Sequence, residues 1–149
     1  MPESLFRRVI VPVSNTDDAE ATTDALAPYV TSAGGVVIAA HVIEKAGGAL
    51  DKASVEQRER SADEIFEVVA DGLANVDIEV ETEYLYGTDV AETIIDAAHD
   101  LDASAIVFTP RGGSRWLKLL TGDVTTDLVN ESDIPVIVLP DTHGGETDE

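Results

Sequence analysis

The chain has 149 residues, no cysteine, and 30 acidic against 9 basic side chains, which gives a formal charge of −21. Its length suits one domain with a substantial core, and the absence of cysteine excludes disulfides, thiolate nucleophiles and cysteine metal sites. The charge argues against binding to nucleic acid or to an anionic membrane surface, because cationic side chains carry both kinds of binding.

The acidic residues are spread through every expected helix instead of forming a separate acidic block. Unscreened, their mutual repulsion opposes a compact fold, whereas at molar salt the Debye length falls to about 3 Å. We therefore expect a salt-adapted protein of the haloarchaeal type; an acidic protein from a low-salt cell is the alternative. The first residues contain no signal-peptide core and no apolar run approaches the roughly 18 residues of a membrane span, which favours the cytoplasm.

Apolar runs alternate along the chain with stretches of helical periodicity. The expected strands are 9–13, 36–43, 76–85, 105–108 and 134–139, and the expected helices are 17–33, 54–74, 88–100 and one from about 124 to 130. Strict alternation of strand and helix predicts a single-domain α/β fold, Rossmann-like, with a parallel sheet and helices on both faces.

The third expected strand differs from the other four. Val76, Ile78 and Val80 alternate with acidic residues, which predicts that one face of this strand meets water. A strand with one solvent-exposed face belongs at a sheet edge, and with right-handed crossovers this gives the strand order 3-2-1-4-5.

Four residues carry local expectations. Ser54 is a candidate cap for the second helix and Thr88 for the third, and Pro28 should kink the first helix or end it early. His41 lies on a central strand and is expected to be a hydrogen-bonded structural histidine, because the histidines show no metal-ligand spacing.

A ligand site in such a sheet lies beyond the carboxyl ends of the strands where the strand order reverses, here between strands one and four. Two loops should meet at that point: one at residues 14–18, and one that begins at Thr109 and contains Gly112, Gly113, Arg111 and Arg115. Glycines let backbone N–H groups approach a phosphate and arginines supply charge. The two readings are an anion site and a turn whose arginines pair with nearby acids.

Two segments make the chain resemble the universal stress protein family. The first is the apolar run Val9–Val13 together with the later run Ala40–Ile43. The second begins at Gly112, continues after nine residues with Gly122, Asp123 and Val124, and leads to the run Ile134–Val138. The resemblance covers about residues 6–140. It implies an adenine nucleotide alpha hydrolase-like fold, a homodimer and, in many members, ATP or another adenine nucleotide at the switch point.

The glycine pattern of the nucleotide-binding members is altered in three places. Thr109 stands where the first glycine belongs, Asp123 where a phosphate-binding Ser or Thr belongs, and Ser14 where an aspartate contacts the nucleotide. Asp123 would repel phosphate, and we expect it to cap the following helix in preference to any catalytic role. No cofactor is assigned with certainty, and these changes weaken the case for ATP. The candidate cofactor-binding residues are Pro12, Ser14, Val42, Thr109, Arg111, Gly112, Gly122, Asp123 and Val124.

The function favoured by these observations is a non-enzymatic stress-response protein with a degenerate nucleotide site, acting as a homodimer on an unknown protein partner. An ATP-binding switch or slow ATPase that uses loop 109–124 is the alternative, and a carrier of another small anion is a third.

Residues 134–139 are apolar at every position yet form an edge strand, which favours pairing between two copies there. Residues 1–140 form the expected domain and 141–149 an acidic tail. The region around Trp116 is expected to pack in the core; a lid, a backward extension of the last helix and a dimer contact are the alternatives.

Overall fold

The computed structural model describes residues 5–44, 52–109 and 123–139. Its elements are β1 (Arg8–Pro12), α1 (Thr16–Ala33), β2 (Val36–Glu44), α2 (Lys52–Gly72), β3 (Glu79–Gly87), α3 (Val90–Asp100), β4 (Ala105–Phe108), α5 (Asp123–Glu131) and β5 (Val136–Val138). All strand pairs are parallel and the order is β3-β2-β1-β4-β5, which confirms the predicted fold class and topology.

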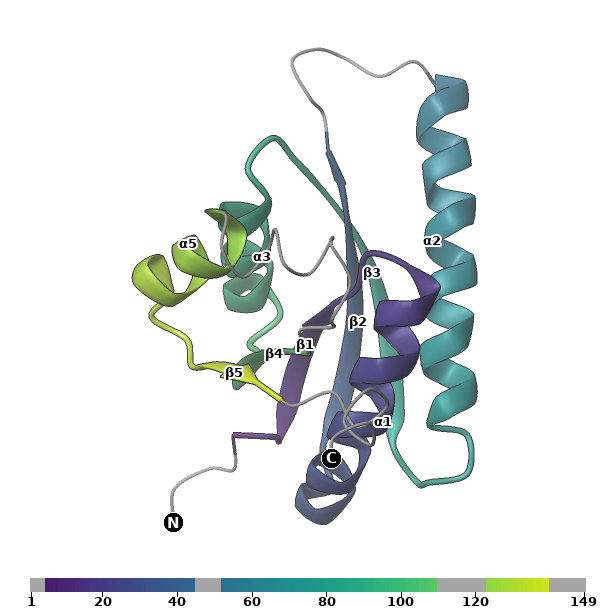
Figure 1. The fold of residues 1–149 in the computed structure, drawn as a ribbon, viewed down its shortest axis with the longest axis vertical. Helices are drawn as coiled ribbons and strands as arrows, with labels where there is room; N and C mark the ends of the chain where they lie inside the picture. Colours follow the sequence, from purple (N-terminus) through teal and green to yellow (C-terminus); the bar gives the residue numbers. More distant parts are fainter. Residues whose placement is uncertain (1–4, 45–51, 110–122, 140–149) are drawn as a thin grey trace, which may run out of the picture.

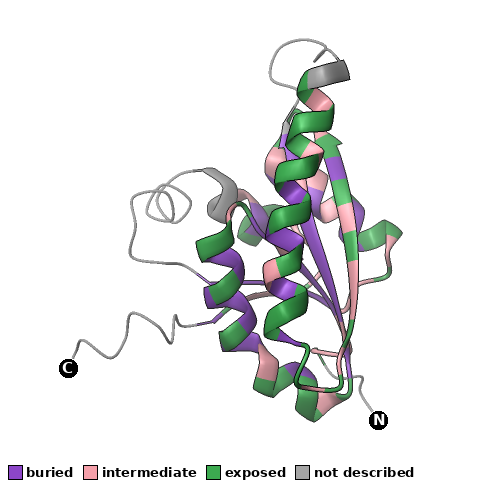
Figure 2. Ribbon diagram, turned by 90° about the vertical axis from the view of Figure 1, so that its right-hand side faces the viewer, coloured by how far each residue is buried: buried purple, intermediate pink, exposed green. Residues whose placement is uncertain are grey.

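Helices cover both faces of the sheet, with α1 and α2 on one side and α3 and α5 on the other (Figure 1). The central strands alternate between the two cores: Val9 and Val11 of β1 pack towards α1 and α2, and Ile10 packs towards α3 and α5. Buried residues accordingly concentrate in the central strands and on the inner sides of the helices (Figure 2). This is why the central strands are continuously apolar in sequence.

The strand β3 begins three residues later and ends two residues later than predicted. The chain is still turning after α2, where the Val76 N–H bonds the Leu73 carbonyl at 3.2 Å. At the other end the ladder continues to Tyr86 and Gly87, because β2 extends to Glu44 and gives them partners. Both faces of β3 are partly covered: Leu85 is buried under α3, and Val80 packs towards α2.

The strand β5 is shorter than the predicted 134–139. A turn precedes it, in which the Ser132 Oγ accepts from the Ile134 N–H at 2.9 Å and donates to the Ile134 carbonyl at 2.7 Å. Backbone bonds still tie both flanks to β4, from the Ile106 N–H to the Pro135 carbonyl and from the Leu139 N–H to the Phe108 carbonyl. The predicted edge position of this segment is confirmed.

Three predictions about helix ends need correction. Pro28 does not end α1 early: the helix continues to Ala33, because Pro28 and Asp24 lie on its exposed side, where water can bind the carbonyl that proline leaves unpaired. α2 begins at Lys52, so Ser54 lies inside it.

The third concerns α3, whose N-cap is Asp89 and not Thr88. The Asp89 carboxylate accepts the Glu92 N–H at 3.0 Å, and its carbonyl accepts the Thr93 hydroxyl at 2.6 Å. A carboxylate is the better acceptor at a positive helix end.

Candidate functional site

The carboxyl ends of β1 and β4 separate from each other. The pairing of β1 with β4 ends at Ile10–Ile106, whereas its pairing with β2 continues to Pro12–Ala40. The space beyond these ends is the switch point of the sheet, where ligands bind in folds of this kind. The structure thus brings the predicted residues Pro12 and Thr109 to the same end of the sheet, on its two diverging strands.

Ser14 follows β1 at this end, and its hydroxyl is used within the protein. It donates to the carboxylate of Asp18, which also accepts the Asn15 Nδ2 amide at 3.2 Å. Asn15 caps α1, with its Oδ1 accepting the Asp18 N–H at 2.8 Å. Asp18 is only 1% exposed, and its charge lies in the first turn of α1, where the helix dipole stabilises an anion.

The sequence analysis named the loop 14–18 but missed the burial of the Asp18 carboxylate and its hydrogen bonds to Ser14 and Asn15. A signal was present, because Asn15 and Asp18 have the spacing of a capping box, with a capping side chain and an acid three residues on. The burial of Asp18 depends on the tertiary packing of α1 and has no sequence signature.

Thr109 directly follows β4, and its side chain is fully buried. Within the described ranges its Oγ1 has no hydrogen-bond partner. Leaving a buried hydroxyl unpaired costs about 1–3 kcal/mol, so a partner for this oxygen beyond the described residues would be favourable.

The neighbouring positions on β2 are structural. The His41 ring Nδ1 lies 2.8 Å from the Val13 carbonyl oxygen, which confirms the predicted hydrogen-bonded structural histidine. Val42, half-buried, packs against the core under α3. No three His, Asp or Glu side chains gather in a metal-binding group among the described residues.

The remaining predicted site residues stay predictions. Arg111, Gly112 and Gly122 lie outside the described residues, as do Trp116 and the tail 141–149. Asp123 and Val124 belong to α5, but their side chains are not described, so neither the capping role of Asp123 nor its contact with phosphate is tested.

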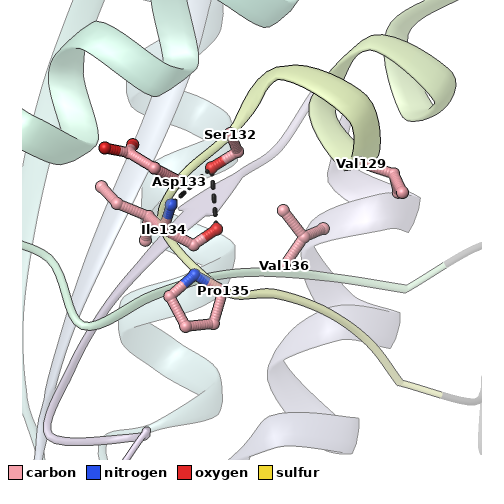
Figure 3. A pocket seen from close by; sticks show the side chains of 6 residues that line it. All are labelled: Val129, Ser132, Asp133, Ile134, Pro135 and Val136. Atoms are coloured by element: carbon pink, nitrogen blue, oxygen red, sulfur yellow. Dashed lines mark hydrogen bonds between the residues drawn. The ribbon is translucent and has the colours of Figure 1, made fainter.

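An open pocket of about 390 Å³ lies away from this site, between the last turn of α5 and the start of β5 (Figure 3). Beside it the His99 Nε2 lies 2.7 Å from an Asp133 oxygen, and this hydrogen bond lowers the pKa of the Asp133 carboxyl. The pocket is at the amino end of the strands, so it is not the switch-point site. Its residues are Val129, Ser132, Asp133, Ile134, Pro135 and Val136.

None of the helices in the described ranges is both long enough and apolar enough to cross a membrane.

Solved structures share this fold. A universal stress protein from Archaeoglobus fulgidus in complex with dAMP has a TM-score of 0.66 and 23% identity, covering 91% of this chain and 98% of its own. A universal stress protein in complex with cAMP has a TM-score of 0.71 and 17% identity, covering 91% and 98%. A universal stress family protein from Arabidopsis thaliana with AMP bound has a TM-score of 0.64 and 13% identity, covering 96% and 97%.

Curated protein sequences contain no significant match to the chain. The sequence profile described as the universal stress protein family matches residues 5–140, which is nearly the whole chain. The fold is therefore the adenine nucleotide alpha hydrolase-like fold of these proteins. The chain belongs to the universal stress protein family.

Proposed function

We propose that the chain is a non-enzymatic stress-response protein whose nucleotide site is degenerate and which acts as a homodimer on a protein partner. The observation that carries the proposal is the Ser14–Asp18 hydrogen bond. The position that contacts nucleotide in binding members, by the resemblance above, is here a short side chain whose only proton is donated to a buried carboxylate. A nucleotide at this site would lack the contact with the aspartate that Ser14 replaces.

The second support is electrostatic. If phosphate approaches the start of α5, as the resemblance implies, the Asp123 carboxylate opposes it. Two unit negative charges about 4 Å apart repel by about 4 kcal/mol at an effective dielectric near 20, against roughly 8 kcal/mol for a micromolar site. Affinity for a triphosphate should therefore be weak.

The test is calorimetric titration of AMP and of ATP with Mg²⁺ into the wild type and Asp123→Ser, in concentrated KCl. If Asp123 caps α5 as predicted, serine keeps the capping oxygen, so the helix should persist. We expect weak binding by the wild type and a gain of about a hundredfold or more in the variant, from a few kcal/mol of relieved repulsion. The matched control is Asp127→Asn, one turn further along α5, which should change affinity little. Tight ATP binding by the wild type would refute the proposal.

The proposed homodimer forms through residues 134–139. β5 is an edge strand and Val138 is 45% exposed, while Val129 of α5, which lines a pocket with Val136 of β5, is 59% exposed. An exposed apolar edge is an aggregation hazard unless another strand or chain covers it. Val138→Lys should give monomers in light scattering, whereas the control Thr82→Lys, on the opposite edge strand β3, should leave the dimer intact. A dimer that survives Val138→Lys would exclude this interface.

A second candidate is an ATP-binding switch or slow ATPase that uses loop 109–124. Two observations favour it: three solved relatives are in complex with adenine nucleotides, and the buried Thr109 hydroxyl lacks a partner in the described part of the chain. If this hydroxyl serves a nucleotide, the isosteric Thr109→Val should weaken AMP binding without unfolding the protein. Phosphate release above the buffer rate, abolished in that variant, would establish the ATPase.

We further propose that this is an acidic, salt-adapted member of the family, of the haloarchaeal type, acting in the cytoplasm. Support comes from the formal charge of −21 on 149 residues. At molar salt the Debye length is about 3 Å, so repulsion between the acidic side chains is screened beyond that distance and the compact fold is no longer opposed.

A further inference from the structure

The outer edge of β3 carries an exposed aromatic pair. Tyr84 and Tyr86 are 38% and 42% exposed, and they project from the same side of the strand because they are two residues apart. β3 has nine residues and pairs only with β2 among the strands that the structure describes. Since alternate residues of a parallel ladder point their N–H and C=O groups to opposite sides, the outer side of β3 presents unpaired backbone groups.

Hydrogen bonds to α2 fix both tyrosine rings. The Tyr84 hydroxyl donates to Asp63 Oδ1 at 2.6 Å, and the Tyr86 hydroxyl donates to Glu59 Oε2. Tyr84 also packs against Phe66, with ring centroids 6.0 Å apart. The hydrogen bond to Asp63 raises the pKa of Tyr84. Partial desolvation of the Tyr86 phenol, followed by its bond to Glu59, raises the pKa of Tyr86 to about 12, so both phenols stay protonated donors.

The surroundings of the rings are negatively charged. Glu59 and Asp63 are four residues apart on α2, a spacing at which like charges destabilise a helix. Neither has a basic partner within ion-pair distance in residues 5–44, 52–109 and 123–139. On the other face of the strand, Glu81 is paired with Arg8 through two 3.2 Å contacts, while Glu79 and Glu83 add further charge.

These charges select what can add to the edge. A second copy of β3 would bring acidic side chains against acidic side chains across the new pair, which is destabilising. A strand with Lys or Arg at alternate positions would instead place its cations on the tyrosine side, where ring faces and carboxylates both attract them. Main-chain hydrogen bonds would supply affinity and the charges specificity.

We propose that the outer edge of β3, with Tyr84 and Tyr86 and the α2 carboxylates Glu59 and Asp63, docks an extended basic segment of a partner protein by strand addition. This surface is two strands removed from the β1–β4 switch point, so it does not depend on nucleotide binding. It supplies a chemistry for the unknown protein partner of the proposed function.

The test uses a fluorescein-labelled decapeptide of alternating Lys and Thr, with anisotropy measured at the lowest KCl concentration at which circular dichroism shows the protein folded. Glu59→Gln with Asp63→Asn should weaken binding by about tenfold or more, because two attractive charges are lost at the contact. The matched control is Glu64→Gln with Asp71→Asn, which removes the same charge from exposed positions elsewhere on α2. The control should change affinity by less than about threefold, as expected for charges outside the contact.

A second measurement leaves the protein unchanged. The same decapeptide N-methylated at every second amide keeps its charge but cannot complete a ladder, and it should bind the wild type about tenfold more weakly or worse. Amide chemical shifts of residues 79–87 should move with the unmodified peptide. Equal loss in the control pair, unchanged binding of the methylated peptide, or no binding at all would overturn the proposal. Nucleotide titration of Glu59→Gln with Asp63→Asn should match the wild type, which separates this proposal from the switch-point function.

Discussion

Gly34 and Gly35 join α1 to β2, and alanine substitutions at the two positions should differ in cost because the two glycines are required for different reasons. Gly34 has φ of 64° and ends α1 in the left-handed region, with open space where a Cβ would lie. Gly35 has ordinary φ, but a Cβ there would overlap the Phe6 carbonyl oxygen and lie 2.9 Å from the Arg7 carbonyl oxygen.

The magnitudes follow from these contacts. Left-handed backbone costs alanine about 1–2 kcal/mol, partly offset by about 0.4–1 kcal/mol from a less flexible unfolded chain, so Gly34→Ala should cost about 1 kcal/mol. For Gly35→Ala the neighbouring backbone must move. That backbone is held by the bonds from the Gly35 N–H to Val30 at 3.0 Å and from the Val36 N–H to Arg7 at 2.9 Å. Overpacking strain plus loosened hydrogen bonds gives about 3 kcal/mol or more.

Urea denaturation in one fixed KCl concentration measures both. With a slope of about 1–3 kcal/mol per molar urea, Gly35→Ala should lower the midpoint by about 1–3 M and Gly34→Ala by less than about 1 M. Gly34→Asn is the control, since asparagine tolerates left-handed backbone and should cost less than alanine there. Equal shifts for Gly34→Ala and Gly35→Ala would refute the argument that backbone overlap, and not conformational freedom, requires the second glycine.

Three further outcomes are expected. The thermal midpoint should rise steeply between about 0.1 M and about 3 M KCl, because salt screens the repulsion among the 30 acids; an unchanged midpoint contradicts salt adaptation. Asn15→Ala should cost about 1 kcal/mol in urea unfolding, since it removes the cap that accepts the Asp18 N–H, and Asn15→Asp should cost less. The Tyr86 pKa is raised from 10.0 to about 12, so the stability that this tyrosine contributes is complete below pH 10 and is lost as the pH rises towards 12. The urea midpoint of the wild type should therefore fall between about pH 9 and about pH 11.5, and Tyr86→Phe should make this fall smaller. A fall of unchanged size in the variant would contradict the argument.

The topology could be predicted because hydrophobic patterns report how many faces of a strand are covered. The continuous apolar runs of β1 and β4 indicate two covered faces, and the alternating acids before Tyr84 indicate an edge. The exact ends of the helices were harder to predict, because neighbouring residues compete for the capping position. Thr88 and Asp89 are both good caps, and only the path of the chain from β3 decides that Asp89 takes the Glu92 N–H.

The site was predictable only in outline. Strand order placed Pro12, Ser14, Val42 and Thr109 at one end of the sheet, because the carboxyl ends of parallel strands share an edge. What the side chains do there depends on contacts with no fixed sequence spacing. The spacing of Asn15 and Asp18 signals the cap of α1, but the burial of the Asp18 side chain depends on how α1 packs and has no such spacing.

The two edges of the sheet have opposite chemistry, and this bears on assembly. A protein that exposed two apolar strand edges could add copies at both and grow without closing, whereas pairing of like edges about a two-fold axis closes at the dimer. β5 presents valine at its edge and β3 presents carboxylates and tyrosines. On the proposals above, the first edge recognises a second copy and the second rejects it. The same acidity that prevents a dimer from extending at β3 leaves that edge open to a strand of opposite charge. An acidic edge can therefore both limit self-association and select a partner.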